Sequence, residues 1–533
     1  MTDDLTATTP AAHPGGDTLT GQPGPDRLDA FISHQAATRP QAPVLRPQDG
    51  PALDFATLDA AVTALADDLA ARGLRPGDRL MIVMENAPEA VVLILSALRA
   101  GAIAVPVNAR LSPDEMDRII AVADARMTAF CDAGCDAGSA DASAHASRAG
   151  AKPGVAPAMS AAPMLAPIAL SAPRTQARPE PMPDGPDRPA VILFTTGTTG
   201  QAKGVVLTHG NLIFGGGSSA RERGMGPGDL ILGVLPLTHV FGLTSMLCAA
   251  LIAGAQIWLW PRFAAGAVLD ALGQGVTLFP GVPQMHALIM AEARAQGRAT
   301  LGSDVLKYVS SGAAPLDPSW KRQAEAFYGT ALQNGYGMTE CSAGATLTRN
   351  PPGDPDTSVG PPLPGVQVTL RPTGGEPGVG EVLIRGPNVM AGYFRDRQAT
   401  AAVLDQAGFL HSGDLGRIDE QGRLHIVGRL KELIIRSGFN VYPPEVEAAL
   451  NTHPEVVQSA VIGRPANGNE EVLAFCQIRP GSTVTEAALL DHARAHLTHY
   501  KLPSRIVTCD ALPAAPTGKV LKHRLLAHFA DRL

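Results

Sequence analysis

The hydrophobic positions in the first quarter of the chain alternate between helical and strand spacing. Apolar residues recur at helical spacing over residues 55–71, whereas residues 79–84 form a nearly continuous apolar run. The same patterns predict a second helix over residues 87–100 and a second strand over 102–107. Such alternation of helices and strands is typical of an α/β fold with a mostly parallel sheet. Further on, Ser112-Pro113-Asp114-Glu115 has the N-cap, first-turn proline and N3 glutamate of a capping box, which predicts the start of a helix.

The segment from Ala190 to Leu212 joins an apolar strand to a loop of small and hydroxyl residues. Residues 190–194 are all apolar, which predicts a buried strand in a parallel sheet. The loop that follows contains threonines, glycines and one cation, at Thr195, Thr196, Gly197, Thr198, Thr199, Gly200 and Lys203. Glycines expose backbone N–H groups and the other residues add hydroxyl donors and a positive charge, so the segment suits a polyphosphate.

This loop differs from a Walker phosphate loop in its spacing. Only two residues separate Gly197 from Gly200, and Lys203 is followed by Gly204 instead of Ser or Thr. A simple Gly/Thr linker between strands is the alternative, and the ordered succession of strand, loop and cation disfavours it. We therefore predict a phosphate-binding loop of another kind.

Two stretches lack the pattern of a packed structure. Residues 1–25 begin with acidic and small residues and are predicted to be a flexible tail. Residues 131–189 are rich in Ala, Pro, Ser and Gly and have no sustained periodicity, which predicts a largely disordered insertion.

The later part of the chain divides into two further units. Short β-like runs at residues 366–370 and 381–385, separated by Pro and Gly, predict a small antiparallel barrel or sandwich. From residue 430 to residue 533, strand and helix patterns predict a compact α+β domain. The main domain is accordingly expected to span residues 26–429.

Composition narrows the classes of partner. The chain has 533 residues, a net charge of −7 and no basic block, which disfavours nucleic acid as a partner. The uncharged stretch between Asp229 and Arg262 is interrupted by Pro, His, Gly and Gln, so we expect buried core elements there and no integral membrane segment. Six cysteines are scattered along the chain, which favours a reducing, cytoplasmic compartment over a disulfide framework.

Six ordered motifs resemble those of the adenylate-forming superfamily of acyl-CoA synthetases, luciferases and peptide-synthetase adenylation domains. They are Thr195–Gly204, Ser311–Leu316, Asn334–Glu340, Ser412–Asp414, Gly428–Ile434 and Pro516–Lys519. The resemblance covers residues 28–526. It implies an α/β N-terminal domain of two mostly parallel sheets flanked by helices, with a small β-barrel, and a mobile α+β C-terminal domain.

The resemblance also implies ATP, Mg²⁺ and coenzyme A as cofactors and assigns roles to individual residues. Lys519 would span the acid carboxylate and the α-phosphate, Glu340 would bind Mg²⁺, and the loop that begins at Thr195 would hold the β- and γ-phosphates. Tyr336 would face adenine and Asp414 the ribose. The further residues implied in nucleotide or coenzyme A binding are Gly312, Ala313, Asn334, Gly335, Gly337, Thr339, Arg429, Lys431 and Gly438.

Two of these predictions concern the acid pocket and the transfer of the acyl group to coenzyme A. His239 matches a histidine that lines the acyl pocket of acyl-CoA synthetases, and a buried histidine bonded to a backbone carbonyl is the alternative. Lys431 matches the hinge about which the C-terminal domain of this superfamily rotates between adenylation and thioester formation.

The predicted activity is AMP-forming acid–CoA ligation. Val240, Phe241, Leu243 and residues 279–282 favour an apolar tail, so a medium- or long-chain fatty acid or an aryl acid is expected rather than a dicarboxylate. Three alternatives stay open: an amino-acid adenylation domain that loads a carrier protein, a non-catalytic acyl-binding relative, and a kinase or ATPase that yields ADP. Residues 234–241 offer no acidic partner for an amine, which disfavours the first. The chain is expected to be a monomer or a homodimer.

Overall fold

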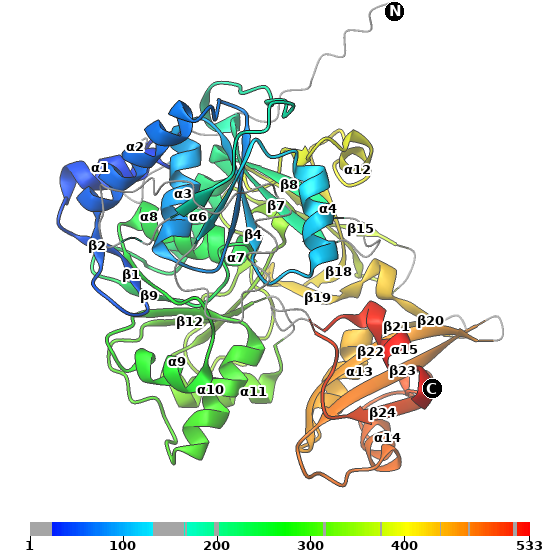
Figure 1. Cartoon of the computed structure of the whole chain (residues 1–533). Coiled ribbons are helices and arrows are strands. Elements are labelled where there is room, and N and C mark those ends of the chain that lie inside the picture. Colours follow the sequence, from blue (N-terminus) through cyan, green and yellow to red (C-terminus); the bar gives the residue numbers. More distant parts are fainter. Residues whose placement is uncertain are drawn as a thin grey trace, which may run out of the picture.

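The protein consists of a larger body followed by a smaller lobe (Figure 1). The computed structural model describes residues 24–131, 165, 168–196, 202–312, 316–373, 376–436, 439–466, 469–514 and 520–533. The predicted tail, up to residue 23, and most of the predicted insertion, at 132–164, 166 and 167, lie outside the described residues.

Two mixed, largely parallel sheets form the frame of the body. One has the strand order β14-β13-β12-β11-β9-β10-β1-β2, and the other has the order β17-β8-β7-β4-β3-β5-β6. The strands of the first are β1 (Pro43–Pro47), β2 (Leu53–Asp54), β9 (Leu230–Gly233), β10 (Gln256–Leu259), β11 (Leu278–Gly281), β12 (Tyr308–Gly312), β13 (Leu332–Tyr336) and β14 (Thr346–Leu347). Those of the second are β3 (Arg79–Met84), β4 (Ile103–Asn108), β5 (Met127–Cys131), β6 (Ile168–Leu170), β7 (Pro189–Thr196), β8 (Ala202–Thr208) and β17 (Gly392–Tyr393).

Helices lie between and outside these sheets (Figure 1). The largest buried cluster combines apolar side chains of α2, α3, α6 and α8 with both sheets, whereas α9, α10 and α11 pack in a second cluster with the other face of the first sheet. The helices of the body are α1 (Ala30–Thr38), α2 (Phe55–Ala71), α3 (Pro88–Arg99), α4 (Pro113–Ala123), α6 (His209–Glu222), α7 (Val240–Gly242), α8 (Ala249–Ala253), α9 (Ala265–Leu272), α10 (Pro283–Ala295), α11 (Pro318–Tyr328) and α12 (Arg397–Ala401).

A third, antiparallel sheet closes the body, in the order β15-β16-β18-β19. Its strands are β15 (Gln367–Pro372), β16 (Gly380–Arg385), β18 (Leu410–Ile418) and β19 (Leu424–Arg429). This sheet is the small β unit that the short apolar runs predicted after residue 351.

Beyond the turn at Leu430–Glu432, the chain forms the lobe. A hairpin of β20 (Ile434–Arg436) and β21 (Phe439–Val441) precedes a sheet of β22 (Val456–Ala466), β23 (Asn469–Ile478) and β24 (Arg505–Cys509). The helices are α13 (Pro443–Asn451), α14 (Glu486–Arg494) and α15 (Leu525–His528). Apolar side chains from these elements form clusters separate from those of the body, so the lobe has its own core.

Several elements follow the sequence pattern closely. Helix α2 and strand β3 have the predicted bounds, because each combines a clear period with a firm stop. The capping box at Ser112 is confirmed: its hydroxyl accepts from the Glu115 backbone and the Glu115 carboxylate accepts from the Ser112 backbone.

Residues 168–189 correct the predicted extent of the disordered insertion. Strand β6 pairs antiparallel with β5, and the Glu180 carboxylate forms an ion pair with Arg395. The Glu180 backbone N–H also donates to the Gly77 carbonyl. Backbone pairing and charge contacts hold this Pro-rich segment against the body. The sequence prediction missed the order of this segment because it relied on hydrophobic periodicity, which such contacts do not require.

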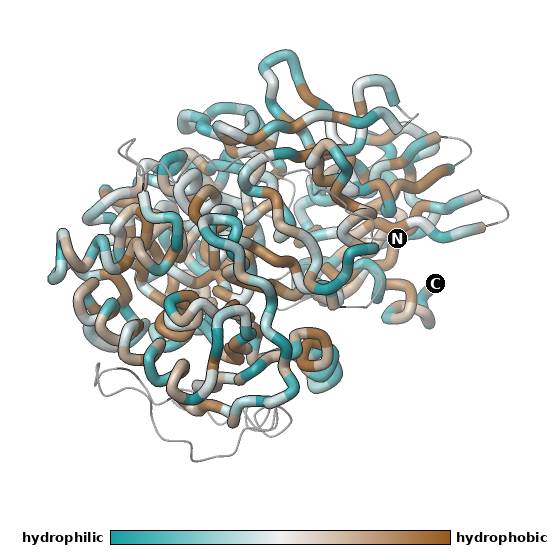
Figure 2. Tube along the Cα trace, turned by 90° about the horizontal axis from the view of Figure 1, so that it is seen from above, coloured by the Kyte–Doolittle hydropathy of each residue, from teal (hydrophilic) through white to brown (hydrophobic). Residues whose placement is uncertain are grey.

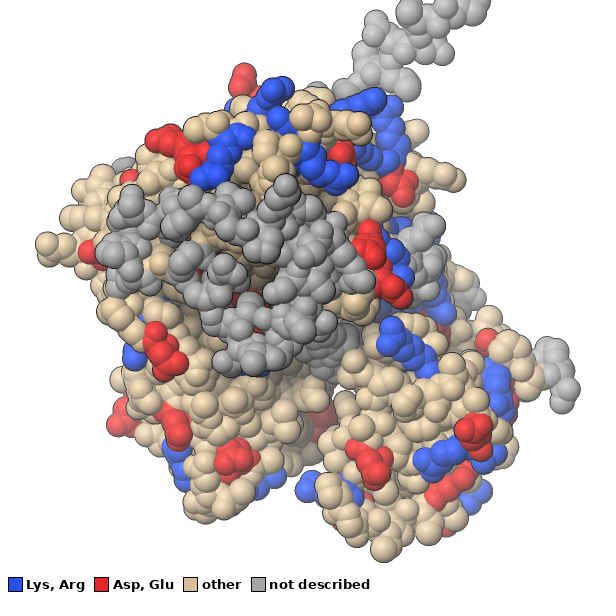
Figure 3. Space-filling model, in the orientation of Figure 1, with Lys and Arg blue, Asp and Glu red and all other residues tan. Residues whose placement is uncertain are grey.

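The surface and the tube view agree with the sequence composition. Figure 2 shows hydrophobic stretches inside the body and hydrophilic ones along outer turns. On the face in Figure 3, Lys and Arg are interspersed with Asp and Glu. Among the helices of the described residues, none is both long and apolar enough to cross a membrane.

Candidate active site

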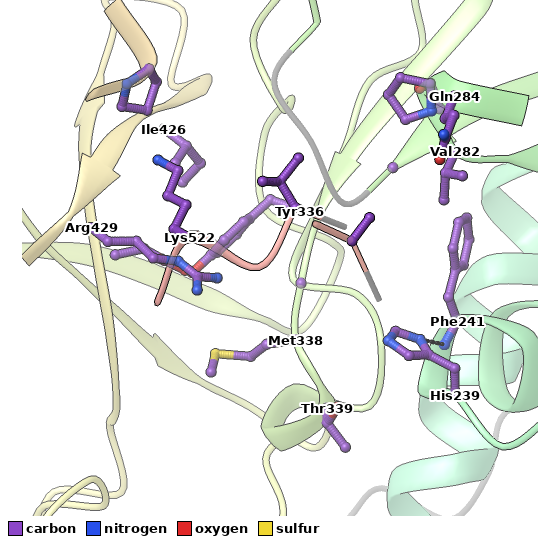
Figure 4. A pocket seen from close by; sticks show the side chains of 18 of the residues that line it. His239, Phe241, Val282, Gln284, Tyr336, Met338, Thr339, Ile426, Arg429 and Lys522 are labelled. Atoms are coloured by element: carbon purple, nitrogen blue, oxygen red, sulfur yellow. Dashed lines mark hydrogen bonds and ion pairs between the residues drawn. The ribbon is translucent and has the colours of Figure 1, made fainter. Parts of the chain in front are cut away.

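A large cavity of about 3930 Å³ lies where the body meets the lobe. Its walls include the ends of β12 and β13, the turn Thr339–Cys341, and strands β18 and β19, together with residues of the lobe. Figure 3 shows a hollow between the two parts of the molecule, and Figure 4 shows side chains from both reaching the cavity. In this view Phe241, Val282 and Gln284 lie on one side, and Arg429 and Lys522 on the other.

Tyr336, Asp414 and Arg429 form a connected group on one wall. Asp414 and Arg429 face each other across the antiparallel pair β18–β19. The Tyr336 hydroxyl donates to Asp414 Oδ2 over 2.6 Å, and Arg429 Nε donates to Oδ1 over 3.0 Å. Burial and the neighbouring Asp414 carboxylate raise the pKa of Tyr336 well above its usual value, so its hydroxyl stays a donor. The geometry thus holds an acidic acceptor, an aromatic ring and a cation in one place, and their roles in nucleotide binding stay a prediction.

Glu340, Tyr393, Lys203 and Thr195 form a second group. Thr195 and Lys203 are paired across the β7–β8 hairpin. Lys203 Nζ lies 4.9 Å from the centre of the Tyr393 ring, and the Tyr393 hydroxyl donates to Glu340 Oε1 over 2.8 Å. Burial and the Glu340 carboxylate raise the pKa of Tyr393. The predicted phosphate cation and the predicted metal ligand therefore contact the same tyrosine side chain, the first at its ring and the second at its hydroxyl.

The surroundings of Glu340 fit a magnesium ion that is shared with a phosphate. The side chain is 8% exposed, and within the described residues it forms no ion pair and no carboxylate hydrogen bond other than that from Tyr393. No group of three or more His, Cys, Asp or Glu side chains able to hold a metal occurs in the described part of the chain. One carboxylate together with substrate phosphates and waters is the usual protein environment of Mg²⁺.

Backbone packing explains the glycines beside these groups. Gly312 and Gly335 are register partners on β12 and β13. At Gly337, a Cβ atom would lie 1.9 Å from the Ala343 carbonyl oxygen, so no larger residue fits. The side chain of Asn334 is committed to the frame, because Nδ2 donates to the Ser358 carbonyl over 3.0 Å.

His239 lines the cavity near the start of α7. Its side chain is exposed, and Nδ1 accepts a hydrogen bond of 3.4 Å from the backbone of Phe241. The alternative of a buried histidine is therefore wrong, because the preceding turn presents His239 to the cavity. Figure 4 shows His239 and Phe241 joined by this hydrogen bond.

The connection between body and lobe is short. Lys431 is exposed in the single turn Leu430–Glu432, immediately after β19. Thr339 is buried at the cavity wall. Four of the loop residues, Gly197 to Gly200, as well as Ala313, Gly438 and Lys519, lie outside the described residues, as does the side chain of Thr196. Ala514 and Val520, which flank the Lys519 motif, both line the cavity.

Tyr393 and Lys522 are among the cavity residues that sequence reasoning missed. Lys522 Nζ forms ion pairs with Glu432 over 3.0 Å and with Glu447 over 2.8 Å. Although burial lowers the pKa of Lys522, the Glu447 and Glu432 carboxylates raise it above the usual value. In the sequence, Lys522 could have been recognised as a cavity residue from its position three residues after Lys519.

The sequence and the fold both match known proteins. A family profile described as AMP-binding enzyme matches residues 32–394, and one described as AMP-binding enzyme C-terminal domain matches residues 445–519. The chain is 34% identical to sulfoacetate–CoA ligase from Cupriavidus necator over 512 residues, which cover 94% of this chain and 98% of that one. It is also 34% identical to feruloyl-CoA synthase from an Amycolatopsis species, with 94% and 99% of the two chains covered. The crystal structure of ATP-bound MatB from Rhodopseudomonas palustris superposes with a TM-score of 0.81 at 32% identity, covering 95% of this chain and 99% of that one.

Proposed function

The chain belongs to the AMP-binding enzyme family, and we propose that separate groups of residues around its cavity bind the nucleotide, the metal and the acid for acid–CoA ligation. As an acid–CoA ligase, it converts a carboxylate and ATP to an acyl-adenylate and pyrophosphate. The thiol of coenzyme A then attacks the acyl carbon, and the thioester, AMP and a proton are the products. The observation that carries this assignment of roles is the convergence of the Asp414 and Glu340 groups on one cavity.

The nucleotide occupies the wall formed by Tyr336, Asp414 and Arg429. Each oxygen of Asp414 already accepts one hydrogen bond, and each retains a second lone pair for a ribose hydroxyl. Tyr336 and Arg429 therefore fix the orientation of the acceptor, while the tyrosine ring offers its face to adenine. Thr339 lies at the same wall, where its hydroxyl is suited to an α-phosphate oxygen.

The phosphates occupy the side of the cavity that holds Thr195 and Lys203. Mg²⁺, held by Glu340, would neutralise charge on the leaving pyrophosphate. Tyr393 keeps the Glu340 carboxylate in place, and Lys203 supplies a fixed cation beside it. These contacts offset the repulsion that a second anion, the acid carboxylate, meets on approach.

Two arrangements of the lobe serve the two steps. The units are residues 26–429 and 430–533, and Lys431 is the hinge. Lys519 enters the cavity for adenylation and leaves for thioester formation, because coenzyme A needs the space. The cavity positions of Ala514 and Val520 support this assignment.

The acid binds beside His239, Phe241 and Val282, on the side of the cavity opposite Arg429. The relatives named above act on sulfoacetate, a short acid with a second anionic group, and on ferulate, an aryl acid. We extend both substrate classes to this chain in place of long-chain fatty acids. The cytoplasm is the proposed compartment, and the four cysteines whose side chains are described, all free and buried, support it.

Product analysis tests the proposal. The enzyme is incubated with ATP, Mg²⁺, coenzyme A and acids of graded length and aromaticity, and pyrophosphate, AMP and thioester are measured. We expect pyrophosphate and AMP in equal amounts with at least one acid class. Formation of ADP, or of no product with any acid, would contradict the proposed function.

A separate experiment tests His239. His239→Ala is expected to keep pyrophosphate formation without coenzyme A and to lose most thioester formation. Unchanged rates of both steps would remove His239 from the acyl pocket machinery.

A further inference from the structure

A buried arginine lines the cavity at the end of helix α6. Arg223 is the C-cap residue of this helix and is 8% exposed. Its Nη1 donates to the Ser245 carbonyl, whereas its Nε is buried without a hydrogen-bond partner. The neighbouring Glu222 pairs with Arg221 and Arg349 instead, and Arg223 forms no ion pair within the described residues.

A buried cation without a counter-charge is unfavourable. Desolvation of an ion is unfavourable unless an opposite charge or a full set of hydrogen bonds compensates for the lost contacts with water. The negative end of α6 and the Tyr308 ring, 5.4 Å from the guanidinium carbon, offset part of this cost. Neither fills the hydrogen-bonding position at Nε.

Strand β12 links Arg223 to the acid site through two further unpaired groups. Because side chains alternate along a strand, Tyr308, Ser310 and Gly312 face the same side. At one end the Phe241 ring lies 3.3 Å from the position of a Cβ on Gly312, and at the other Arg223 lies over Tyr308. The Tyr308 hydroxyl and Ser310 Oγ are buried and have no hydrogen-bond partner. Four residues of strand span about 13 Å, which is roughly the length of a straight-chain diacid of ten carbon atoms.

The opposite wall carries more polar groups. Ser245 lies in the π-helical turn Leu243–Cys248, four residues after Phe241, and its hydroxyl is 3.2 Å from that of Ser219. Both serines line the cavity with Arg223. Single π-helical turns occur often at functional sites, since the widened turn redirects a carbonyl or side chain. The end of the acid site is therefore polar, although its entrance beside Phe241 is apolar.

We propose that Arg223, with the hydroxyl of Ser310, binds an anionic group at the end of the acid remote from the reacting carboxylate. This inference rests on the proposed acid–CoA ligase function and names its substrate class: an acid of up to about ten carbon atoms that carries a second carboxylate or a sulfonate. The ion pair supplies the missing partner of Nε and the acceptor for the Ser310 hydroxyl. It replaces the sequence-based expectation of an apolar tail, which considered Phe241 and its neighbours and not Arg223.

Matched acid pairs test the inference in the intact enzyme. Pyrophosphate release gives kcat/KM for four matched pairs: butanoate and succinate, hexanoate and adipate, octanoate and suberate, and decanoate and sebacate. At one length or more, the dicarboxylate is expected to exceed its monoacid by at least about 10-fold, as a hydrogen-bonded charge supplies. Arg223→Met keeps the length of the side chain and is expected to remove about 10–100-fold from the dicarboxylate and to leave the monoacid unchanged or improved.

Arg221→Met is the matched control, because Arg221 lies on the same helix, bonds Ser218 and does not line the cavity. This control is expected to retain the wild-type ratio. Arg223→Lys keeps the charge and provides a second reading if the methionine variant does not fold, which thermal denaturation reports. Wild-type preference for the monoacid at every length, or equal ratios in the Arg223→Met and Arg221→Met enzymes, would overturn the inference. The ligase function would stand in both cases, since it fails only if no acid releases pyrophosphate.

Discussion

Replacement of Tyr393 by phenylalanine isolates one hydrogen bond at the proposed metal site. The variant removes the hydroxyl that donates 2.8 Å to Glu340 and keeps the ring that lies beneath Lys203. Because burial and the Glu340 carboxylate raise the Tyr393 pKa, the wild-type hydroxyl is protonated over the working pH range. The variant therefore changes the orientation of the carboxylate and no charge.

The expected effect is a lower affinity for Mg²⁺. Loss of a residue that orients a metal ligand costs about 10–100-fold in metal affinity, or about 1.4–2.7 kcal/mol. The Glu340 side chain has no other hydrogen-bond donor among the described residues, so compensation from nearby groups is small. We expect the Mg²⁺ concentration for half-maximal pyrophosphate release to rise by that factor, with little change in rate at saturating Mg²⁺.

Tyr336→Phe is the matched control, since it removes a hydroxyl of the same kind from Asp414 on the nucleotide wall. Mg²⁺ titrations at saturating acid are compared for both variants and the wild type. The control is expected to raise the KM for ATP and to leave the Mg²⁺ midpoint in place. Equal Mg²⁺ midpoints in all three enzymes would refute the assignment of Glu340 and Tyr393 to the metal side of the cavity.

Three further predictions concern the lobe, the glycine frame and acid stability. Lys519→Ala is expected to abolish adenylate formation and to retain thioester formation from supplied acyl-adenylate, and equal loss of both steps would contradict a two-position lobe. Gly337→Ala places a methyl group 1.9 Å from the Ala343 carbonyl and is expected to lower the melting temperature and activity. By contrast, Gly217→Ala lies within helix α6 with nothing within 4 Å of the new methyl group, and is expected to keep the activity and to raise the melting temperature slightly. Burial lowers the pKa of His209 from 6.5 to about 3, so the unfolded chain binds a proton that the folded chain excludes, and stability falls as the pH drops below about 6.5. The loss is about 1.4 kcal/mol per pH unit, so melting temperatures at pH 7.5 and 5 are expected to differ more for the wild type than for His209→Gln.

The sequence predicted elements well where a strong period meets a clear stop. Helix α2 and strand β3 are examples, because apolar residues in Phe55 to Ala71 repeat at helical spacing and the strand Arg79 to Met84 is apolar after its first residue. Whether neighbouring strands run parallel or antiparallel was harder to predict. The strand at residues 190–194 was expected in a parallel sheet, and β7 does lie parallel to β4, yet it is antiparallel to β8. An apolar run records burial and carries no information about the direction of its partner.

The site was predictable in its motif residues and not in the partners that hold them. Tyr336, Asp414 and Arg429 come together as expected. Arg223 carried no motif, because its significance arises from a helix end that meets β12, about 85 residues later in the chain. Tyr393 likewise reaches Glu340 only through the pairing of β17 with β8. Long-range pairing of this kind leaves no local period in the sequence.

The hairpin of β7 and β8 separates phosphate binding from the helix macrodipole. In a Walker or dinucleotide-binding loop, the phosphate meets the N-terminus of the next helix, whose partial positive charge is fixed. Here β8 runs from Ala202 to Thr208 before α6 begins, which places the helix start about 23 Å along the strand. In the proposed assignment, neutralisation of the triphosphate would consequently depend on discrete cations, Lys203 and an exchangeable Mg²⁺. Because the magnesium charge would leave with pyrophosphate, Lys203 would be the fixed cation that remains, and we expect this arrangement to favour release of the product over tight retention of nucleotide.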